Sequence, residues 1–404
     1  MRRLCICIAL TCLAAAPTLF AQTASPTAQT PLTPGQVERQ AAGDTADNPG
    51  PLAVDLPTDL KPASIEKAMR KVADWQITSA EKRFNQQWTF APLYDGLIAT
   101  SQATGDPKYA ATVEQLAQQR FNWKLIDVRF PHADDEAIGQ AYLDLYRAHP
   151  SSEKIAATKE IMDRLVSHPD DPNKPVWWWC DALFMAPSVL ARMSAITGDP
   201  KYLNYMDHEW WITSSLLYNQ TEHLYWRDAT FLKKTEKNGK PLFWARGNGW
   251  VLAGLADVLR FMPADYPSRP KYVAQFQEMA KRIASLQQPD GLWKTGLLDQ
   301  QDYAMSEVSG TAFFTYGIAA SINLGLLKES EYRPVLERAW AGMVHHIYAD
   351  GRLGSIQPIG AAPDSFAPGS SYVYGVGGFL LAGNQLHQLG RPNSVTVNLS
   401  SGRK

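Results

Sequence analysis

The chain has 404 residues, of which 45% are hydrophobic and 20% charged, and its formal net charge is −1. This composition is typical of a globular protein with a large core, and the near-zero charge argues against a surface built for nucleic acid or another polyanion. Aromatic residues make up 11% of the chain, a content that suits stacking on sugar rings as well as packing in a core.

Residues 1–21 have the pattern of a secretory signal peptide. Arg2 and Arg3 precede an apolar stretch at 4–13, and small residues follow up to Ala21. We therefore expect an exported protein, periplasmic or extracellular, and no later apolar run is long enough to span a bilayer. Of the four cysteines, only Cys180 lies outside the signal. A disulfide within the mature chain is thus excluded, and a buried thiol is favoured over a nucleophile at this position.

The rest of the chain divides into three parts. Residues 22–59 are rich in Thr, Pro, Ala, Gln and Asp and almost lack large apolar side chains, which predicts a disordered linker. A single catalytic domain is expected over 60–392, followed by a C-terminal tail over 393–404.

From residue 60 onward, an amphipathic helix alternates six times with a helix that is apolar nearly all round. The apolar helices are expected near 90–103, 134–148, 181–196, 248–262, 309–324 and 375–388. The helix at 309–324 carries no charge, so it must be buried on every side. Two concentric rings follow, and the predicted fold is an all-α (α/α)6 barrel of six helical hairpins. Residues 218–245 interrupt the alternation and predict a small extended excursion beside the site.

Polar and aromatic residues stand where the six apolar helices begin. Because these helices run in the same direction, their first turns gather at one mouth of the barrel, where acids, an arginine and aromatic rings would meet as a carbohydrate site. Each acid taken alone is better explained as a helix cap, but the whole set favours function. The residues are Trp88, Tyr94, His132, Asp134, Asp135, Trp178, Trp179, Asp181, Trp244, Arg246, Trp250 and Glu307.

Asp181 is the most informative residue of this set. It follows three consecutive tryptophans, Trp177 to Trp179, and precedes an apolar helix. Exclusion of water raises the pKa of a carboxyl group, and a carboxylic acid that stays protonated near neutral pH can donate a proton in catalysis. The alternative is a core tryptophan cluster with Asp181 as a helix N-cap.

Four motifs resemble glycoside hydrolase family 105, the unsaturated rhamnogalacturonyl hydrolases, which are related to the family 88 unsaturated glucuronyl hydrolases. They lie at 132–146, 179–187, 243–250 and 307–314. The resemblance implies a substrate with a C4=C5 double bond, a 4-deoxy-4-enuronosyl residue left at the non-reducing end by a polysaccharide lyase. It also implies hydration of that enol ether without a cofactor or metal. Rhamnogalacturonan-type oligosaccharides are the expected substrates.

The resemblance also implies roles for single residues. Asp181 matches the general acid/base, Asp134 the second aspartate, and Arg246 the arginine that would bind the uronate carboxylate. Trp244 and Trp250 would be stacking or wall residues. The choice of Asp134 over Asp135 stays open, as does whether His223, Arg227 or neither reaches the substrate.

Two other functions remain open at this point. The same barrel could be an inverting hydrolase of saturated glycosides, which would need the carboxyl groups of Asp134 and Asp181 roughly 6.5–9.5 Å apart. It could also bind sugar without chemistry, since fold does not fix function. The oligomeric state and the sugar attached to the uronate are not specified by these residues.

Overall fold

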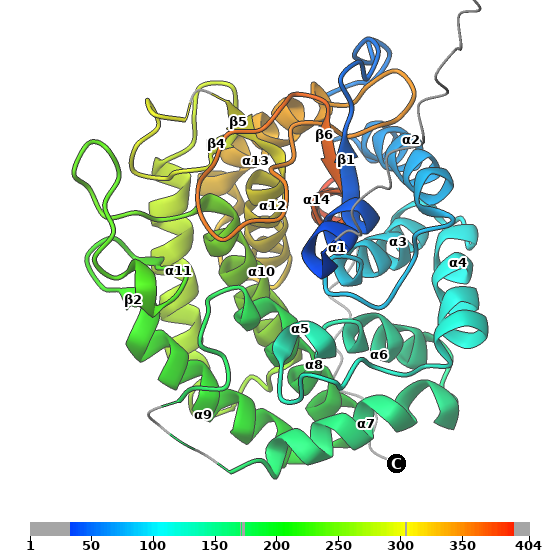
Figure 1. Cartoon of the computed structure of the whole chain (residues 1–404), viewed down its shortest axis with the longest axis vertical. Helices are drawn as coiled ribbons and strands as arrows, with labels where there is room; N and C mark the ends of the chain where they lie inside the picture. Colours follow the sequence, from blue (N-terminus) through cyan, green and yellow to red (C-terminus); the bar gives the residue numbers. More distant parts are fainter. Residues whose placement is uncertain (1–32, 170, 172–173, 304, 392–404) are drawn as a thin grey trace, which may run out of the picture.

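The computed structural model describes residues 33–169, 171, 174–303 and 305–391. Around the centre of Figure 1, each inner helix packs against the next, and the last packs back against the first, so the ring closes. The inner helices are α3 (Ala91–Thr104), α6 (Gly139–Ala148), α8 (Ala182–Thr197), α10 (Ala245–Phe261), α12 (Val308–Asn323) and α14 (Val373–Leu389).

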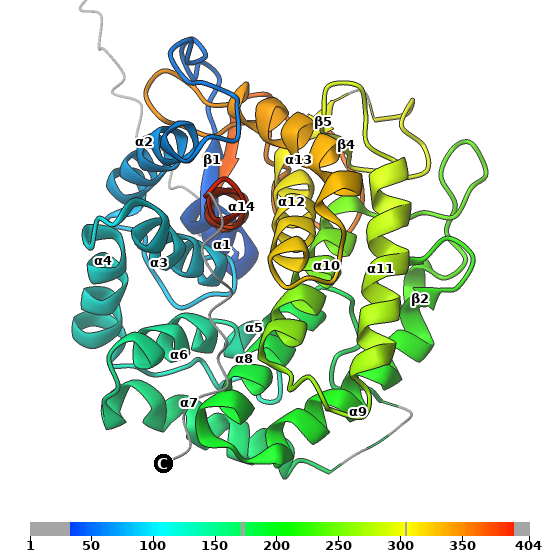
Figure 2. The ribbon, with the colours of Figure 1, turned by 180° about the vertical axis from the view of Figure 1, so that it is seen from behind.

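A second set of helices surrounds this ring, as both views along the barrel show (Figures 1 and 2). It consists of α2 (Pro62–Ala80), α4 (Lys108–Leu116), α7 (Ser152–Val166), α9 (Pro200–Leu217), α11 (Arg269–Ser285) and α13 (Glu329–Val344). The predicted (α/α)6 barrel is therefore confirmed. No helix in the described ranges is long and apolar enough to cross a membrane.

Local sequence explains why the helices start and stop where they do. Phe313, Phe314 and Ile318 on the charge-free helix α12 are fully buried. Helices α3 and α8 end at Gly105 and Gly198, which have φ of 67° and 71°, the left-handed conformation that glycine adopts without strain.

The inner ring departs from its expected form at one position. The predicted helix at 134–148 is split into a short α5 (Ala133–Glu136) and α6. The acids of the His132–Glu136 motif therefore lie on a separate turn in front of the barrel helix.

Short strands and single turns fill the connections. The excursion at 218–245 contains the antiparallel pair β2 (Tyr218–Asn219) and β3 (Leu224–Tyr225), the 3-10 turn η2 (Ala229–Phe231), and a bridge from Thr235 to Pro241 around Gly239. This agrees with the extended hairpin predicted there. Elsewhere, β4 (Trp293–Lys294) pairs with β5 (Ser306–Glu307), and the π-turn η1 (Ala117–Phe121) follows α4.

The segment before the barrel differs from the disordered linker predicted for 22–59. Within its described part, α1 (Pro34–Ala42) leads into β1 (Gly43–Thr45), which pairs antiparallel with β6 (Ser370–Tyr372). Asp44 forms an ion pair with Arg352. Backbone pairing and ion pairs fix this segment without a large apolar surface, so its composition gave no sign of order. The predicted signal at 1–21 and the tail at 393–404 lie outside the described residues.

Candidate active site

The first turns of the inner helices meet at one mouth of the barrel. Trp88, just before α3, stacks on Tyr374 of α14 with ring centroids 5.6 Å apart and meets the edge of Trp250 of α10 at 6.3 Å. The ring centroid of Trp179 lies 4.8 Å from that of His132 and 4.7 Å from that of Trp178. Trp178 is 48% exposed, so part of its ring surface is open to solvent.

Asp181 stands directly before α8, but its side chain does not cap that helix. It occupies the N-cap position without a side-chain capping hydrogen bond, and it is only 12% exposed. Its contacts are the thiol of Cys180, whose Sγ lies 3.4 Å from Oδ2, and Nε of Arg227 at 3.8 Å. Burial raises the pKa of Asp181, and the charge of Arg227 opposes that rise. The carboxyl group is therefore available for chemistry.

Asp134 on α5 is the second acid of the mouth. Its side chain is 16% exposed, and its Oδ2 lies 3.8 Å from Nδ1 of His132 and 4.0 Å from Nη1 of Arg129. Burial raises the pKa of Asp134 to about 7; Arg129 lowers it, and the negative charge of Asp181 raises it further. The turn α5 that carries Asp134 packs against α8, and the ring centroid of His132 beside it lies 4.8 Å from that of Trp179, so both acids stand at the same mouth. A pKa near 7 suits proton transfer at neutral pH.

Arg227 reaches the mouth from the excursion that follows α9. The backbone N–H of Cys180 donates to the carbonyl of Arg227 at 2.8 Å, which ties the excursion to the start of α8. The guanidinium donates to Asp228 at 2.7 Å and lies 5.4 Å from the ring centroid of Trp178. Its Nε is buried and donates no hydrogen bond to any described residue. Arg227 thus has one N–H without a hydrogen-bond partner among the described residues, and it lies beside Asp181.

His223, the other open candidate on the excursion, lies away from the mouth. Its Nδ1 is 3.1 Å from the hydroxyl of Tyr218 and 3.4 Å from Glu278 on α11.

The guanidinium of Arg246 is held through its two terminal nitrogens, and only its buried Nε lacks a hydrogen-bond partner among the described residues. Arg246 is 1% exposed, donates to the carbonyls of Gln357 and Pro358 at 2.7 and 2.9 Å, and lies between the rings of Trp244 and Tyr374. These contacts with a distant loop occupy the group, although its charge still lowers the pKa of Asp181.

Two further expected site residues have structural partners. Glu307 is fully buried and accepts from the N–H groups of Ser309, Gly310 and Gln357 at 2.9, 2.6 and 3.0 Å, which makes it the N-cap of α12. Asp135 is 2% exposed and forms an ion pair with Arg129. Both carboxylates are therefore held by their own protein partners.

Tyr94 and the two tryptophans of α10 belong to the core. Tyr94 is 1% exposed, donates to the carbonyl of Asn85 at 2.6 Å, and packs against Phe84, Phe90 and Phe121. Trp250 is fully buried and Trp244 is 2% exposed. They form the wall behind the site.

Glu136 and Arg129 are the residues that sequence reasoning missed. Burial raises the pKa of Glu136 to about 8, and Arg129 faces both Asp134 and Asp135. Glu136 lies within the motif at 132–146, where it was interpreted only as a partner for the helix dipole. Arg129 lies outside every motif and gave no signal.

The mouth therefore combines two carboxyl groups with raised pKa values, a guanidinium with a free donor, and an exposed tryptophan. The model of Glycosyl Hydrolase Family 88 matches residues 63–389. The chain belongs to this family.

Relatives of this family 88 protein are similar over most of their length. An unsaturated 3S-rhamnoglycuronyl hydrolase of Formosa agariphila is 38% identical to this chain, and the alignment covers 82% of this chain and 92% of that protein. A protein of the same name from an Alteromonas species is 32% identical over 83% of this chain and 89% of its own. The solved structure of a family 88 protein from Bacteroides vulgatus matches with a TM-score of 0.76 and 32% identity, covering 81% and 99% of the two chains. Because it belongs to family 88 and its relatives are named hydrolases, this protein is a glycoside hydrolase.

Proposed function

We propose that this protein removes a 4-deoxy-4,5-unsaturated uronosyl residue from the non-reducing end of lyase-generated oligosaccharides. The observation that carries the proposal is Asp181, a buried carboxyl group at the start of a helix that it does not cap. Its raised pKa favours the neutral acid, which is the form that can give a proton to an enol ether.

The reaction that fits this acid is hydration of the double bond. Protonated Asp181 transfers its proton to C4, and positive charge develops at C5, where the ring oxygen shares it. Water adds at C5 and gives its proton to the Asp181 carboxylate, which restores the acid. The resulting hemiketal at C5 opens the ring and releases the sugar that was attached at C1.

Asp134 has the position for a supporting role. Its pKa of about 7 allows it to be ionised in the active enzyme, so it can accept a hydrogen bond from the attacking water. A negative Asp134 also favours the protonated form of Asp181, since like charges in one buried site repel.

Arg227 is the residue we assign to the substrate carboxylate. Its side chain is 20% exposed and its Nε lies 3.8 Å from Asp181, whereas Arg246 is 1% exposed and donates through both terminal nitrogens to backbone carbonyls. A guanidinium there pairs with the C6 carboxylate next to the reacting C4–C5 bond. Trp178 and Trp88 would stack on the sugar rings, with His132 at the edge of the same wall.

The names of the two relatives bear on the next sugar. Both are called unsaturated 3S-rhamnoglycuronyl hydrolases, and we read 3S as a sulfate at O3 of rhamnose. We therefore propose that the released sugar is a 3-sulfated rhamnose, with the unsulfated rhamnogalacturonan fragment as the second candidate. The signal-like residues 1–21 support a periplasmic or extracellular place of action, which cleavage mapping by N-terminal sequencing of the exported protein would test.

The deciding experiment follows the ultraviolet absorbance of the enuronate in lyase digests of sulfated rhamnoglycuronan and of rhamnogalacturonan. The wild type is expected to abolish the absorbance, and Asp181→Asn is expected to leave it unchanged. Asp199→Asn, which alters an ordinary cap of α9, is the matched control and keeps full activity. Sugar release with constant absorbance would instead establish hydrolysis of a saturated glycoside, and rising absorbance would establish elimination.

A further inference from the structure

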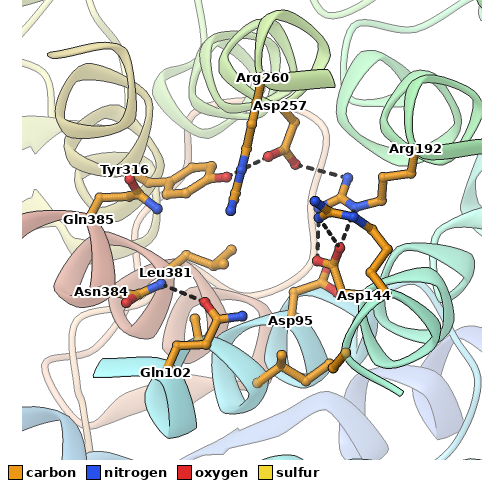
Figure 3. A pocket seen from close by; sticks show the side chains of 14 residues that line it. Asp95, Gln102, Asp144, Arg192, Asp257, Arg260, Tyr316, Leu381, Asn384 and Gln385 are labelled. Carbon is orange, nitrogen blue, oxygen red and sulfur yellow. Dashed lines mark hydrogen bonds and ion pairs between the residues drawn. The ribbon is translucent and has the colours of Figure 1, made fainter. Parts of the chain in front are cut away.

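A cavity lies between the inner helices at the end of the barrel opposite Asp181. Its volume is about 330 Å³, at the lower end of the range of small-molecule sites and enough for roughly ten water molecules. Each inner helix contributes a side chain from its C-terminal half, as Figure 3 shows from close by. These are Gln102, Asp144, Arg192, Arg260, Tyr316 and Gln385.

One side of this cavity is a closed network of charges. Arg192 holds Asp144 through Nε and Nη2 at 3.2 and 3.3 Å, and its Nη1 lies 3.5 Å from Asp257. Tyr316 donates to the other oxygen of Asp257 at 2.5 Å. In Figure 3 the guanidinium of Arg192 lies between the two acids. These groups satisfy one another and need no ligand.

Asp95 shares no hydrogen bond with that network, although the charge of Arg192 acts on it. It lines the cavity, it is 5% exposed, and neither of its carboxyl oxygens has a hydrogen-bond partner among the described residues. A buried carboxyl group without a partner is costly, and such groups in native proteins are nearly always satisfied by protein, water or a ligand. Burial raises the pKa of Asp95 well above its usual range, so it can both donate and accept a hydrogen bond.

Donors without acceptors face Asp95 across the space. Arg260 is exposed at the rim of the cavity, and its charge lowers the pKa of Asp144. Gln102 and Gln385 use their amide oxygens to accept from Asn384 and Asn323 at 3.1 and 2.9 Å, which leaves their N–H groups for the cavity. A ligand that suits these groups carries several acceptor oxygens and at least one hydroxyl.

We propose that this cavity binds a hydroxylated carboxylate the size of one hexuronate ring, with its carboxylate on Arg260 and a hydroxyl on Asp95. Arg147, which lies 3.6 Å from Asp144 and lines the same rim, adds a second positive charge for the anion. A metal ion does not suit the site, because Arg192 occupies the space between Asp144 and Asp257. In the described part of the chain, no group of three or more His, Cys, Asp or Glu side chains could hold an ion.

The proposed site is separate from the catalytic mouth. Arg192 follows Asp181 by eleven residues along α8, which corresponds to about 16 Å of helix. Binding in this cavity can therefore be measured without turnover, and its outcome is independent of the proposed reaction.

The test is a calorimetric titration of the full chain with sodium D-glucuronate. Arg260→Gln and Asp95→Leu are each expected to raise the dissociation constant at least tenfold. Asp95→Asn keeps a donor and an acceptor, so its dissociation constant should stay within threefold of the wild-type value. Arg333→Gln removes an exposed charge on α13 and is the matched control. Arg227→Met at the mouth is expected to leave this binding unchanged.

Three results would overturn the proposal. Glucuronate binding that is lost in Arg227→Met and kept in Arg260→Gln would place the only site at the mouth. If sulfate binds as tightly as glucuronate, the cavity recognises anions in general and not a hydroxylated carboxylate. If glucuronate up to about 50 mM shows no saturable binding, the cavity holds ordered water and not this ligand. If Asp95→Leu fails to fold by circular dichroism, the exposed Arg260→Gln decides alone.

Discussion

Nε of Arg227 lies 3.8 Å from Oδ2 of Asp181, at the start of an inner helix that Asp181 does not cap. The two residues are 46 positions apart, and the backbone bond from Cys180 to Arg227 holds them together. This pairing puts a proton donor beside a cation, the combination that an unsaturated uronate requires.

Replacing Arg227 is expected to weaken substrate binding without unfolding the protein. Arg227→Met removes a charge-assisted contact with the C6 carboxylate, so KM should rise about 10- to 100-fold. Because Arg227 lowers the pKa of Asp181, the alkaline limb of the kcat/KM profile should also move to higher pH. Steady-state kinetics against pH measures both effects, and an unchanged KM would remove Arg227 from the substrate site.

The same substitution at Arg246 should lower the melting temperature and leave KM nearly unchanged. Arg246→Met leaves the buried carbonyls of Gln357 and Pro358 without their donor, which costs about 3 kcal/mol and lowers the melting temperature by roughly 4 °C. KM of the folded enzyme should stay within threefold. A large rise in KM with unchanged melting would return the carboxylate-binding role to Arg246.

The two neighbouring aspartates can be separated by their pH profiles. Asp134 must be ionised to orient water, and its pKa of about 7 predicts that kcat/KM falls as pH drops below that value. Asp134→Asn should lose this acidic limb and reduce kcat about 10²- to 10³-fold. Asp135→Asn should keep the limb and lower the melting temperature instead, since it breaks the buried pair with Arg129. Persistence of the limb in Asp134→Asn would assign it to another group.

The attachment of the N-terminal segment can be tested with a single methyl group. A Cβ at Gly43 would lie 2.1 Å from the carbonyl oxygen of Ser371, whereas a Cβ at Gly35 would meet nothing within 4 Å. Gly43→Ala should therefore separate β1 from β6 at a cost of about 1–3 kcal/mol and open residues 43–48 to limited proteolysis. Gly35→Ala should behave as the wild type. Equal protection of both variants would show that strand pairing does not hold the segment.

Much of this architecture could be predicted from residue patterns. A helix without charge has only one stable environment, so the apolar run at 309–324 specified an inner ring. The apolar runs at 90–103 and 181–196 likewise predicted α3 and α8 to within a residue or two at each end. The segment at 33–59 could not be predicted, because strand pairing with residues 370–372 leaves no trace in local composition.

For the candidate site, the sequence predicted which types of residue are present but not which of them are available to a substrate. The sequence by itself determined that acids, arginines and tryptophans stand at the starts of the inner helices, because helix period and caps are local properties. Only the tertiary structure decided which of them are free. Arg246 is occupied by carbonyls 111 and 112 residues away, and Asp135 and Glu307 by their own partners. Asp134, Asp181 and Arg227 keep groups directed into the mouth. The physical reason is that the availability of a polar group depends on partners that the chain brings together only when it folds.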